Sequence, residues 1–389
     1  MTLAKRSLTN GRVARLPASG IRRFFDLATG LEGVISLGVG EPDFVTPDAF
    51  RNAAIKSIVD GQTQYTSNYG LLALREAIAA HTERLRGVAY DPLLEILVTV
   101  GVSEAVDLAL RATLNDGDEV IVADPSYVAY VPGIILAGGV PVGVPTEERS
   151  DFRLRPEDVR KAVTPRTRAI LLGFPNNPTG AVLLPEDVAG IAALAREHDL
   201  LIYADEIYDR LVYGVEFHSI LGESAMKERT IYLAGFSKSY AMTGWRVGYA
   251  CAPAEIIEQM MKIHQYTVMC VPTAAQHAAL EALRSGEDEV RAMVAQYDKR
   301  RKRMYERFNA MGLSCFEPRG AFYCFPNITS TGLSDGEFSE RLLTEEKVVV
   351  VPGSAFGEHG AGHIRACYAA SMERIEEACD RVERFIGRL

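Results

Sequence analysis

Short apolar runs alternate with amphipathic stretches through the middle of the chain, from Glu95 to Ala252. Runs rich in Val, Ile and Leu between turn residues predict buried strands at 95–100, 119–124, 168–174, 200–205, 230–235 and 245–251. Apolar residues at helical spacing predict helices at 103–114 and 185–199. Strands that alternate with helices predict a mostly parallel sheet, covered by helices on both faces.

The pattern changes after about residue 290. A long charged helix is predicted at 296–311, and three short strand-like runs and a final amphipathic helix follow it. These elements predict a smaller α+β lobe. The N-terminal segment is expected to join this lobe, since a chain often returns to its start.

Composition narrows the class of protein. The chain has 389 residues, 48% of them hydrophobic, which suits one large and one smaller lobe with a real core. The net charge of −9 argues against nucleic acid or an anionic membrane as the main partner. The six cysteines form no C-x-x-C pair and the seven histidines show no metal-ligand spacing, so we expect reduced thiols and no metal site. With no secretory signal and no long apolar segment in this sequence, a cytoplasmic protein is expected.

Polar residues follow several predicted strands at their carboxyl ends, where open α/β sheets bind ligands. Ser103 begins the helix after strand 95–100, so this turn is either an anion site or an ordinary helix cap. Asp205 ends strand 200–205, and Tyr208 lies one turn beyond it. A buried carboxylate there needs a cation or strong donors, and the alternative is again a cap.

Lys238 is the strongest candidate for chemistry. It follows strand 230–235, with Ser237 beside it and Arg246 eight residues later. This arrangement resembles an amine nucleophile next to a phosphate clamp. The alternative is an ordinary surface lysine, which is the more common role of a lysine at such a position. Asn177 stands in a rigid Asn-Pro turn after strand 168–174. With Asp205 and Tyr208, these residues match pyridoxal phosphate chemistry, which needs a lysine, a carboxylate for the ring nitrogen and a phosphate cradle.

The chain carries, in order from about residue 17 to its end, the motifs LGVGEPDF, YTSNYGLLALREAI, NNPTG, DEIY, SKSYAMTGWRVGY, GAFYCFP, VVPGSAFG and HIRACYA. This series resembles the class I pyridoxal-phosphate aminotransferases, in the branch of prokaryotic aspartate, aromatic and broad-range enzymes. The resemblance implies a fold type I α/β structure. It also implies a large cofactor-binding domain at 45–290, a small domain formed by 1–44 and 291–389, and a homodimer with shared active sites.

The resemblance also implies roles around the cofactor ring. Lys238 is expected to bind the cofactor covalently and Asp205 to pair with its ring nitrogen. Asn177 and Tyr208 are expected to bond the ring hydroxyl, and Tyr127 to stack on the ring.

The remaining roles concern the phosphate and the substrate. The residues expected to hold the phosphate are Val102, Ser103, Glu104, Ser237 and Arg246. Tyr65 resembles a tyrosine that the neighbouring subunit lends to this phosphate. Arg365 is expected to bind the substrate α-carboxylate, helped by Asn177 and the backbone at Gly40. The implied reaction is a ping-pong transfer of an amino group from an L-amino acid to a 2-oxo acid, in which Lys238 moves the Cα proton.

Other functions remain open at this point. Gly101 to Ala105 nearly spells the nucleophile elbow of a serine hydrolase, with Ser103 as nucleophile and His359 or His363 as its base, but that interpretation leaves Lys238 without a role. A C–S lyase, a racemase or a cyclopropane-forming synthase would keep the cofactor and change the reaction. A pyridoxal-binding regulator would need a DNA-binding domain, for which the chain has no spare length.

The substrate is the least determined feature. Dicarboxylate-specific members need an extra cation, and only Arg22 or Arg23 is a candidate, with an exposed helix face as the alternative for both. An apolar pocket could be lined by Tyr127, Phe24, Phe25 and Phe356, or these could be core residues of the small domain. The sequence favours aromatic or broad-range amino donors with 2-oxoglutarate as acceptor. Aspartate, alanine and N-acetyl-diaminopimelate are the alternative donors.

Overall fold

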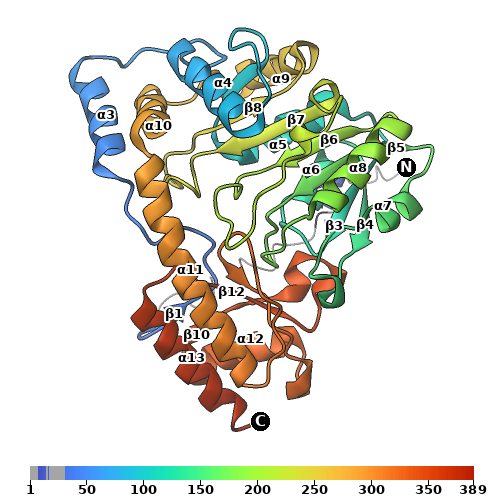
Figure 1. Cartoon of the computed structure of the whole chain (residues 1–389), viewed down its shortest axis with the longest axis vertical. Helices are drawn as coiled ribbons and strands as arrows, with labels where there is room; N and C mark the ends of the chain where they lie inside the picture. The colour runs from blue at the N-terminus through green and yellow to red at the C-terminus, as the bar shows by residue number, and fades with distance from the viewer. Residues whose placement is uncertain (1–7, 15, 17–30) are drawn as a thin grey trace, which may run out of the picture.

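The computed structural model describes residues 8–14, 16 and 31–389, and its centre is a seven-stranded sheet (Figure 1). The strands lie in the order β2-β8-β7-β6-β5-β3-β4. Strand β8 is antiparallel to both its neighbours, and the other pairs are parallel. The strand bounds are β2 Ile96–Thr99, β3 Glu119–Asp124, β4 Val140–Pro145, β5 Thr167–Gly173, β6 Leu201–Asp205, β7 Thr230–Gly235 and β8 Gly248–Cys251. All strands except β8 therefore end at the same edge of the sheet.

The predicted strands are confirmed, with one addition and one shift. Strand β4 was not predicted, because its two prolines and central glycine are poor strand formers. It lies at the edge of the sheet, where a missing backbone donor is tolerated. The strand expected at 245–251 begins only at Gly248, because Arg246 has a left-handed backbone with φ of 54°.

Helices cover both faces of this sheet, as predicted. In β5, Ala169 and Leu171 face a cluster shared with α5, α6 and α9, whereas Ile170 and Leu172 face a cluster shared with α7 and α8. A third cluster packs α3, α4 and α10 against β2, β7 and β8. The bounds are α3 Asp48–Val59, α4 Leu72–Arg86, α5 Gly101–Thr113, α6 Tyr130–Leu136, α7 Pro156–Ala162, α8 Pro185–Glu197, α9 Ala254–Thr267 and α10 Thr273–Ser285. Short α1, Gly11–Ala14, lies against α6.

The later part of the chain forms a separate, smaller layer around an antiparallel sheet in the order β11-β12-β9. Helix α11 runs from α10 beside the large sheet down to α13 (Figure 1). Both α11 and α13 contribute to a cluster of fully buried residues that includes Tyr297, Phe308 and Phe385. The bounds are α11 Glu287–Ala310, β9 Tyr323–Cys324, α12 Asp335–Glu346, β10 Val348–Val349, β11 Val351–Pro352, β12 Ile364–Cys367 and α13 Met372–Ile386.

An N-terminal segment lies within this smaller layer. Strand β1, Ile35–Ser36, pairs in parallel with β10, and Leu37 then accepts a hydrogen bond of 2.7 Å from the Cys367 backbone. The segment after residue 34 is thus held by two C-terminal strands. The exact domain limits at residues 44 and 290 stay a prediction, since α11 continues without a break from one layer to the other.

Two other kinds of site are absent from the described residues. No helix in the described part of the chain is long and apolar enough to cross a membrane. Within the same residues, no three His, Cys, Asp or Glu side chains gather in a way that could hold a metal ion.

Candidate active site

A cavity of about 620 Å³ opens at the carboxyl edge of the large sheet and is bordered by residues of the smaller layer. Its size is typical of a small-molecule site. The structure brings nearly all sequence-predicted site residues to this cavity: Gly40, Val102, Ser103, Tyr127, Asn177, Asp205, Tyr208, Ser237, Lys238, Arg246 and Arg365. They come from segments far apart in the sequence, and the sheet places them together because its parallel strands end there.

Lys238 stands in the turn after β7, and its amine donates a hydrogen bond of 2.6 Å to the Gly40 carbonyl. The amine also lies 5.9 Å and 5.7 Å from the ring centres of Tyr208 and Phe322. Burial lowers the pKa of Lys238 to about 8, and the positive charge of Arg365 acts in the same direction. A substantial fraction of this amine is therefore neutral near pH 8 and able to act as a nucleophile or base.

Asp205 is the last residue of β6, and its side chain is buried at the cavity floor. Its Oδ2 accepts a hydrogen bond of 2.8 Å from the Tyr130 hydroxyl, and its Oδ1 accepts one of 3.3 Å from the Ile207 backbone. Burial raises the pKa of Asp205 to about 6, while these two bonds and the charge of Lys238 oppose the rise. The carboxylate can therefore pair with a cationic ring nitrogen in the cavity.

Arg365, on β12, presents a guanidinium held on both faces and both ends. One Nη donates to Oδ1 of Asn177 at 2.9 Å and the other to the Gly38 carbonyl at 2.6 Å. The rings of Tyr323 and Phe356 lie with their centres 4.5 Å and 4.8 Å from its central carbon. Its Nε is buried and has no partner among the described residues, so the group can take up a further acceptor.

Arg246 faces the start of α5. A Cβ added at Gly101 would lie 2.5 Å from an Nη of Arg246 and would displace this guanidinium, and the φ of 73° at Gly101 also favours glycine. The positive φ of Arg246 is a conformation that costs about 1 kcal/mol or more, which the surrounding structure must offset. Beside it, Val102 and Ser103 lie in the first turn of α5, where backbone N–H groups have no helical partner. The cation and the helix end together form an anion cradle.

Two tyrosines that the sequence analysis did not assign belong to this site. Tyr323 borders the cavity, and its hydroxyl lies 2.7 Å from the hydroxyl of Tyr208. Tyr130 bonds Asp205 and packs edge-on against Tyr127, with ring centres 5.4 Å apart. The spacing of Tyr127 and Tyr130 would have placed both on one side of a helical turn. Tyr323 stands in the motif GAFYCFP, which carries the family resemblance but predicts no role for this tyrosine.

Two predicted residues are not at the cavity. The Glu104 carboxylate accepts a hydrogen bond of 2.5 Å from the Val100 backbone and lies 2.8 Å from Nδ1 of His264, so its side chain cannot hold a phosphate there. Only the backbone N–H of Glu104 is left for that role. Tyr65 has an 80% exposed side chain in the segment between α3 and α4, so its proposed role in a neighbouring subunit stays a prediction.

Of the four apolar or aromatic residues suggested for a substrate pocket, the structure describes two, Phe356 and Tyr127. Phe356 belongs to the hydrophobic core and packs on Arg365, so it is a core residue. Tyr127 borders the cavity. Phe24, Phe25, Arg22 and Arg23 lie outside the described residues.

A hydrolase site is not assembled around Ser103. His359 lies 2.8 Å from the Asp124 carboxylate, and His363 stacks on Phe325 with ring centres 4.9 Å apart. Among the described residues that line the cavity there is no histidine, and the proposed base is therefore missing.

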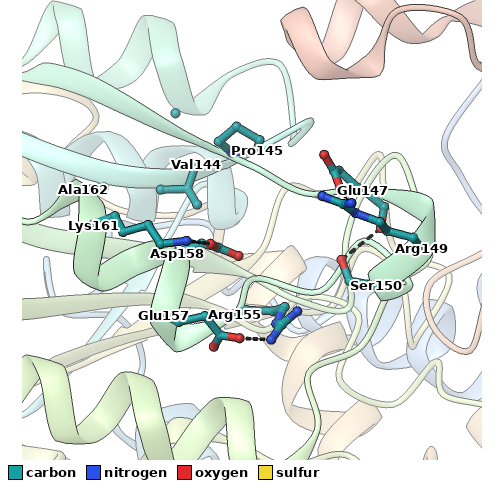
Figure 2. A pocket seen from close by; sticks show the side chains of 11 residues that line it. Val144, Pro145, Glu147, Arg149, Ser150, Arg155, Glu157, Asp158, Lys161 and Ala162 are labelled. Atoms are coloured by element: carbon teal, nitrogen blue, oxygen red, sulfur yellow. Dashed lines mark hydrogen bonds and ion pairs between the residues drawn. The ribbon is translucent and has the colours of Figure 1, made fainter.

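A second hollow, of about 710 Å³, lies between β4 and α7 (Figure 2). Its basic side chains are each paired with an acidic neighbour: Lys161 with Asp158 at 2.7 Å, Arg155 with Glu157, and Arg149 with Glu147. None of the predicted site residues lines it, and its charges offer no unpaired group to a ligand.

The fold and the lysine-centred cavity are those of a cofactor-dependent transferase, and comparison with known proteins names the family. A model of the family "Aminotransferase class I and II" matches residues 32–382, so the chain belongs to this family. It is an aminotransferase, and enzymes of this class use pyridoxal 5′-phosphate with amino acid and 2-oxo acid substrates.

Relatives and solved structures cover almost the whole chain. The aromatic-amino-acid aminotransferase 2 of Thermococcus litoralis is 47% identical over 378 residues, which are 96% of this chain and 97% of that protein. An aspartate aminotransferase of Pyrococcus abyssi is 47% identical over 371 residues, 95% of each chain. The crystal structure of an aromatic aminotransferase from Pyrococcus horikoshii superposes with a TM-score of 0.90 at 45% identity, covering 95% of this chain and 99% of that one.

The residues at the cavity fit this cofactor. The anion cradle at Arg246 and α5 suits a phosphate, and the Asp205 carboxylate suits a protonated ring nitrogen. The Lys238 amine, with its lowered pKa, suits covalent attachment to an aldehyde. The guanidinium of Arg365 borders the cavity and keeps a donor without a partner, which suits a carboxylate of the substrate.

Proposed function

We propose that this enzyme moves the amino group of an aromatic amino acid, or of a broad range of L-amino acids, to a 2-oxo acid such as 2-oxoglutarate by a ping-pong mechanism. The observation that carries the proposal is the meeting of a lysine of lowered pKa, a buried aspartate and a stacked arginine at one cavity.

Each residue at the cavity has a proposed role toward the cofactor. Lys238 would hold it covalently, Asp205 its ring nitrogen, Asn177 and Tyr208 its ring hydroxyl, and Tyr127 its ring face. The residues that would hold its phosphate are Val102, Ser103, Ser237, Arg246 and the backbone of Glu104. When bound, pyridoxal phosphate supplies an electron sink that makes the Cα–H bond of the substrate acidic.

The protein's own groups position the substrate and move its proton. Arg365 binds the α-carboxylate through the guanidinium N–H groups that Asn177 and Gly38 leave unused, with Asn177 and the backbone at Gly40 beside it. This contact fixes which bond at Cα faces Lys238. Lys238 then accepts the Cα proton as a general base, for which a pKa of about 8 is well suited at neutral pH.

The lining of the cavity supports aromatic or broad-range donors. Among the described lining residues, the basic side chains are Lys238, Arg246 and Arg365, and all three have roles toward the cofactor or the α-carboxylate. No further cation for a second carboxylate stands among these described lining residues, so the distal carboxylate of 2-oxoglutarate would need a partner from outside them. The side chains of Val39, Val106, Pro132 and Leu136 offer apolar surface instead. Aspartate is the second candidate donor, since a relative that is 47% identical is named an aspartate aminotransferase.

The test is a visible absorption spectrum of the purified enzyme with single amino acids and no 2-oxo acid. Loss of the yellow colour with phenylalanine or tyrosine, faster than with aspartate, alanine or N-acetyl-diaminopimelate, supports the proposal. Faster bleaching by aspartate makes it an aspartate aminotransferase. Release of ammonia or thiol without bleaching would instead reveal a lyase. Lys238→Ala is the control and should show no bleaching with any donor.

We also propose a homodimer with shared active sites, working in the cytoplasm. Exposed apolar residues gather on and after α3: Ile55, Ile58, Val59 and Tyr65. Such a patch is typical of a subunit interface. The six cysteines are all free, which suits a reducing compartment.

A further inference from the structure

Tyr323 contacts several groups that the proposed function uses, although it has no role there itself. The side chain is fully buried, stands on β9, and borders the cavity. Its ring lies against the Arg365 guanidinium, and its hydroxyl lies against the Tyr208 hydroxyl. We propose that Tyr323 is a positioning residue with two separable functions: its ring aligns Arg365 for the substrate carboxylate, and its hydroxyl aligns Tyr208 for the cofactor. The inference rests on the proposed function, in which Arg365 and Tyr208 have these roles.

The ring of Tyr323 forms one half of an aromatic clamp on Arg365. The central guanidinium carbon is 4.5 Å from the Tyr323 ring centre and 4.8 Å from that of Phe356. Asn177 and Gly38 fix two of its nitrogen atoms in the guanidinium plane, while the rings restrain its two faces. A cation held in this way loses less freedom when a carboxylate binds.

The hydroxyl of Tyr323 is hydrogen-bonded to the neutral hydroxyl of Tyr208. Burial raises the pKa of both Tyr208 and Tyr323, so neither is ionised at neutral pH and one must donate to the other across 2.7 Å. If Tyr323 donates, the proton of Tyr208 is left to point at a ring oxygen of the cofactor. Hydrogen bonds in such a chain strengthen one another, so Tyr208 becomes a better donor.

The chain leaves room for this hydroxyl at Gly40. A Cβ added at Gly40 would overlap the hydroxyl oxygen of Tyr323, so a larger residue would push the two apart. The carbonyl of the same Gly40 accepts the hydrogen bond of the Lys238 amine. The Tyr323 hydroxyl is therefore seated between Tyr208 and the segment that holds the reactive lysine.

Two variants separate the functions. Tyr323→Phe keeps the ring and removes the hydroxyl, whereas Tyr323→Leu removes both. The first measurement is the dissociation constant of 3-phenylpropionate, an unreactive carboxylate, from the holoenzyme. The Leu variant should bind it about tenfold more weakly, the size expected from losing one face of a stacked cation, and the Phe variant within about twofold of wild type.

The second measurement is the pH at which half of the bound cofactor is protonated, followed through the change in its visible absorbance. Weaker donation from Tyr208 leaves more negative charge on the ring oxygen, which favours the protonated chromophore. Tyr323→Phe should therefore raise this midpoint by about half a pH unit or more, and lower kcat with little change in KM. Tyr213→Phe is the matched control, since its buried hydroxyl donates to the Ala321 carbonyl at 2.6 Å in the same core and does not border the cavity.

The results distinguish this inference from the proposed function. Unchanged phenylpropionate binding in Arg365→Lys contradicts the role of Arg365 and thereby the proposed function. Weakened binding in Arg365→Lys together with wild-type binding in Tyr323→Leu overturns the proposed role of the Tyr323 ring. A Tyr323→Phe midpoint equal to that of Tyr213→Phe overturns the role of its hydroxyl.

Discussion

The Tyr130 hydroxyl donates a hydrogen bond of 2.8 Å to Oδ2 of Asp205, the carboxylate at the floor of the cavity. The two residues meet because Gly173 lies directly opposite Asp205 in the pairing of β5 with β6. A Cβ on Gly173 would overlap the Tyr130 hydroxyl, so the missing side chain makes the space for this bond. The bond stabilises the charged form of a carboxylate whose burial favours the neutral one.

Tyr130→Phe should therefore raise the pKa of Asp205 further above its present value of about 6. We expect a rise of about one unit, the usual effect of losing a hydrogen bond to a buried charge. The carboxylic acid band in the infrared spectrum of the cofactor-free protein reports this pKa, and Asp205→Asn identifies the band. Tyr203→Phe is the control, because its buried hydroxyl bonds the Thr113 hydroxyl and not Asp205. Equal titration in the two Phe variants would contradict the prediction.

Asp205→Asn should stabilise the cofactor-free protein above pH 6 while abolishing transamination. The pKa of Asp205 is raised from 3.8 to about 6 in the folded protein, so folding favours the neutral acid. The resulting stability is fully present below pH 3.8 and is lost as the pH rises through 6. Above that pH the buried charge costs up to about 3 kcal/mol, which Asn avoids.

Thermal unfolding at pH 4 and pH 8 measures this difference. The midpoint of Asp205→Asn should exceed that of wild type at pH 8 and approach it at pH 4. Asp199→Asn is the control, since its side chain is 91% exposed. An Asp205→Asn protein that is less stable than wild type at pH 8 would show that the carboxylate stabilises the fold.

Capture of pyridoxal phosphate by Lys238 should rise with pH around 8. Burial lowers the pKa of this amine from 10.5 to about 8, and only the neutral amine attacks an aldehyde. Short reaction of cofactor-free protein with the aldehyde, reduction with borohydride and mass spectrometry of the peptide measure the trapped fraction at each pH. Lys238→Ala gives the background from surface lysines. A half-maximum near pH 10 would mean that burial does not lower this pKa.

Tyr65 and Lys238 should act in the same active site from different subunits. Tyr65→Ala and Lys238→Ala should each be impaired alone, the first through weaker cofactor binding. After unfolding and refolding together, mixed dimers would contain one site with both changes and one with neither. Activity should then reach up to about a quarter of wild type, since half of random dimers are mixed and each has one intact site. A mixture no more active than its parents would place Tyr65 outside the site.

Much of the fold could be predicted from the sequence because its buried strands leave a strong local pattern. The runs at 119–124 and 230–235 are strands with those limits. The rule that ligands bind at strand ends then brought Asn177, Asp205 and Lys238 to one place. β4 escaped prediction because its two prolines and its glycine are poor strand formers.

The contacts of Tyr130 and Tyr323 could not be predicted from the local sequence pattern. Tyr323 and Tyr208 are separated by 115 residues, and their hydroxyls meet because the segment after β6 and strand β9 pack into one buried cluster. The bond from Tyr130 to Asp205 likewise depends on the register of two strands and on the empty side-chain position at Gly173. Glu104 was expected to help hold the phosphate through its backbone or side chain because it lies in the first turn of α5, but its carboxylate turns to the Val100 backbone and His264.

The pairing of β1 with β10 has a consequence for the order in which the enzyme is made. Residues 35–40 supply the carbonyls that hold Arg365 and Lys238, and they are positioned by backbone bonds to residues between 347 and 367. On the ribosome, this early segment must wait for more than 300 residues of later chain before its partners exist. The cavity is therefore completed only when translation is nearly over, and a nascent chain that stops before β10 has no finished carboxylate site.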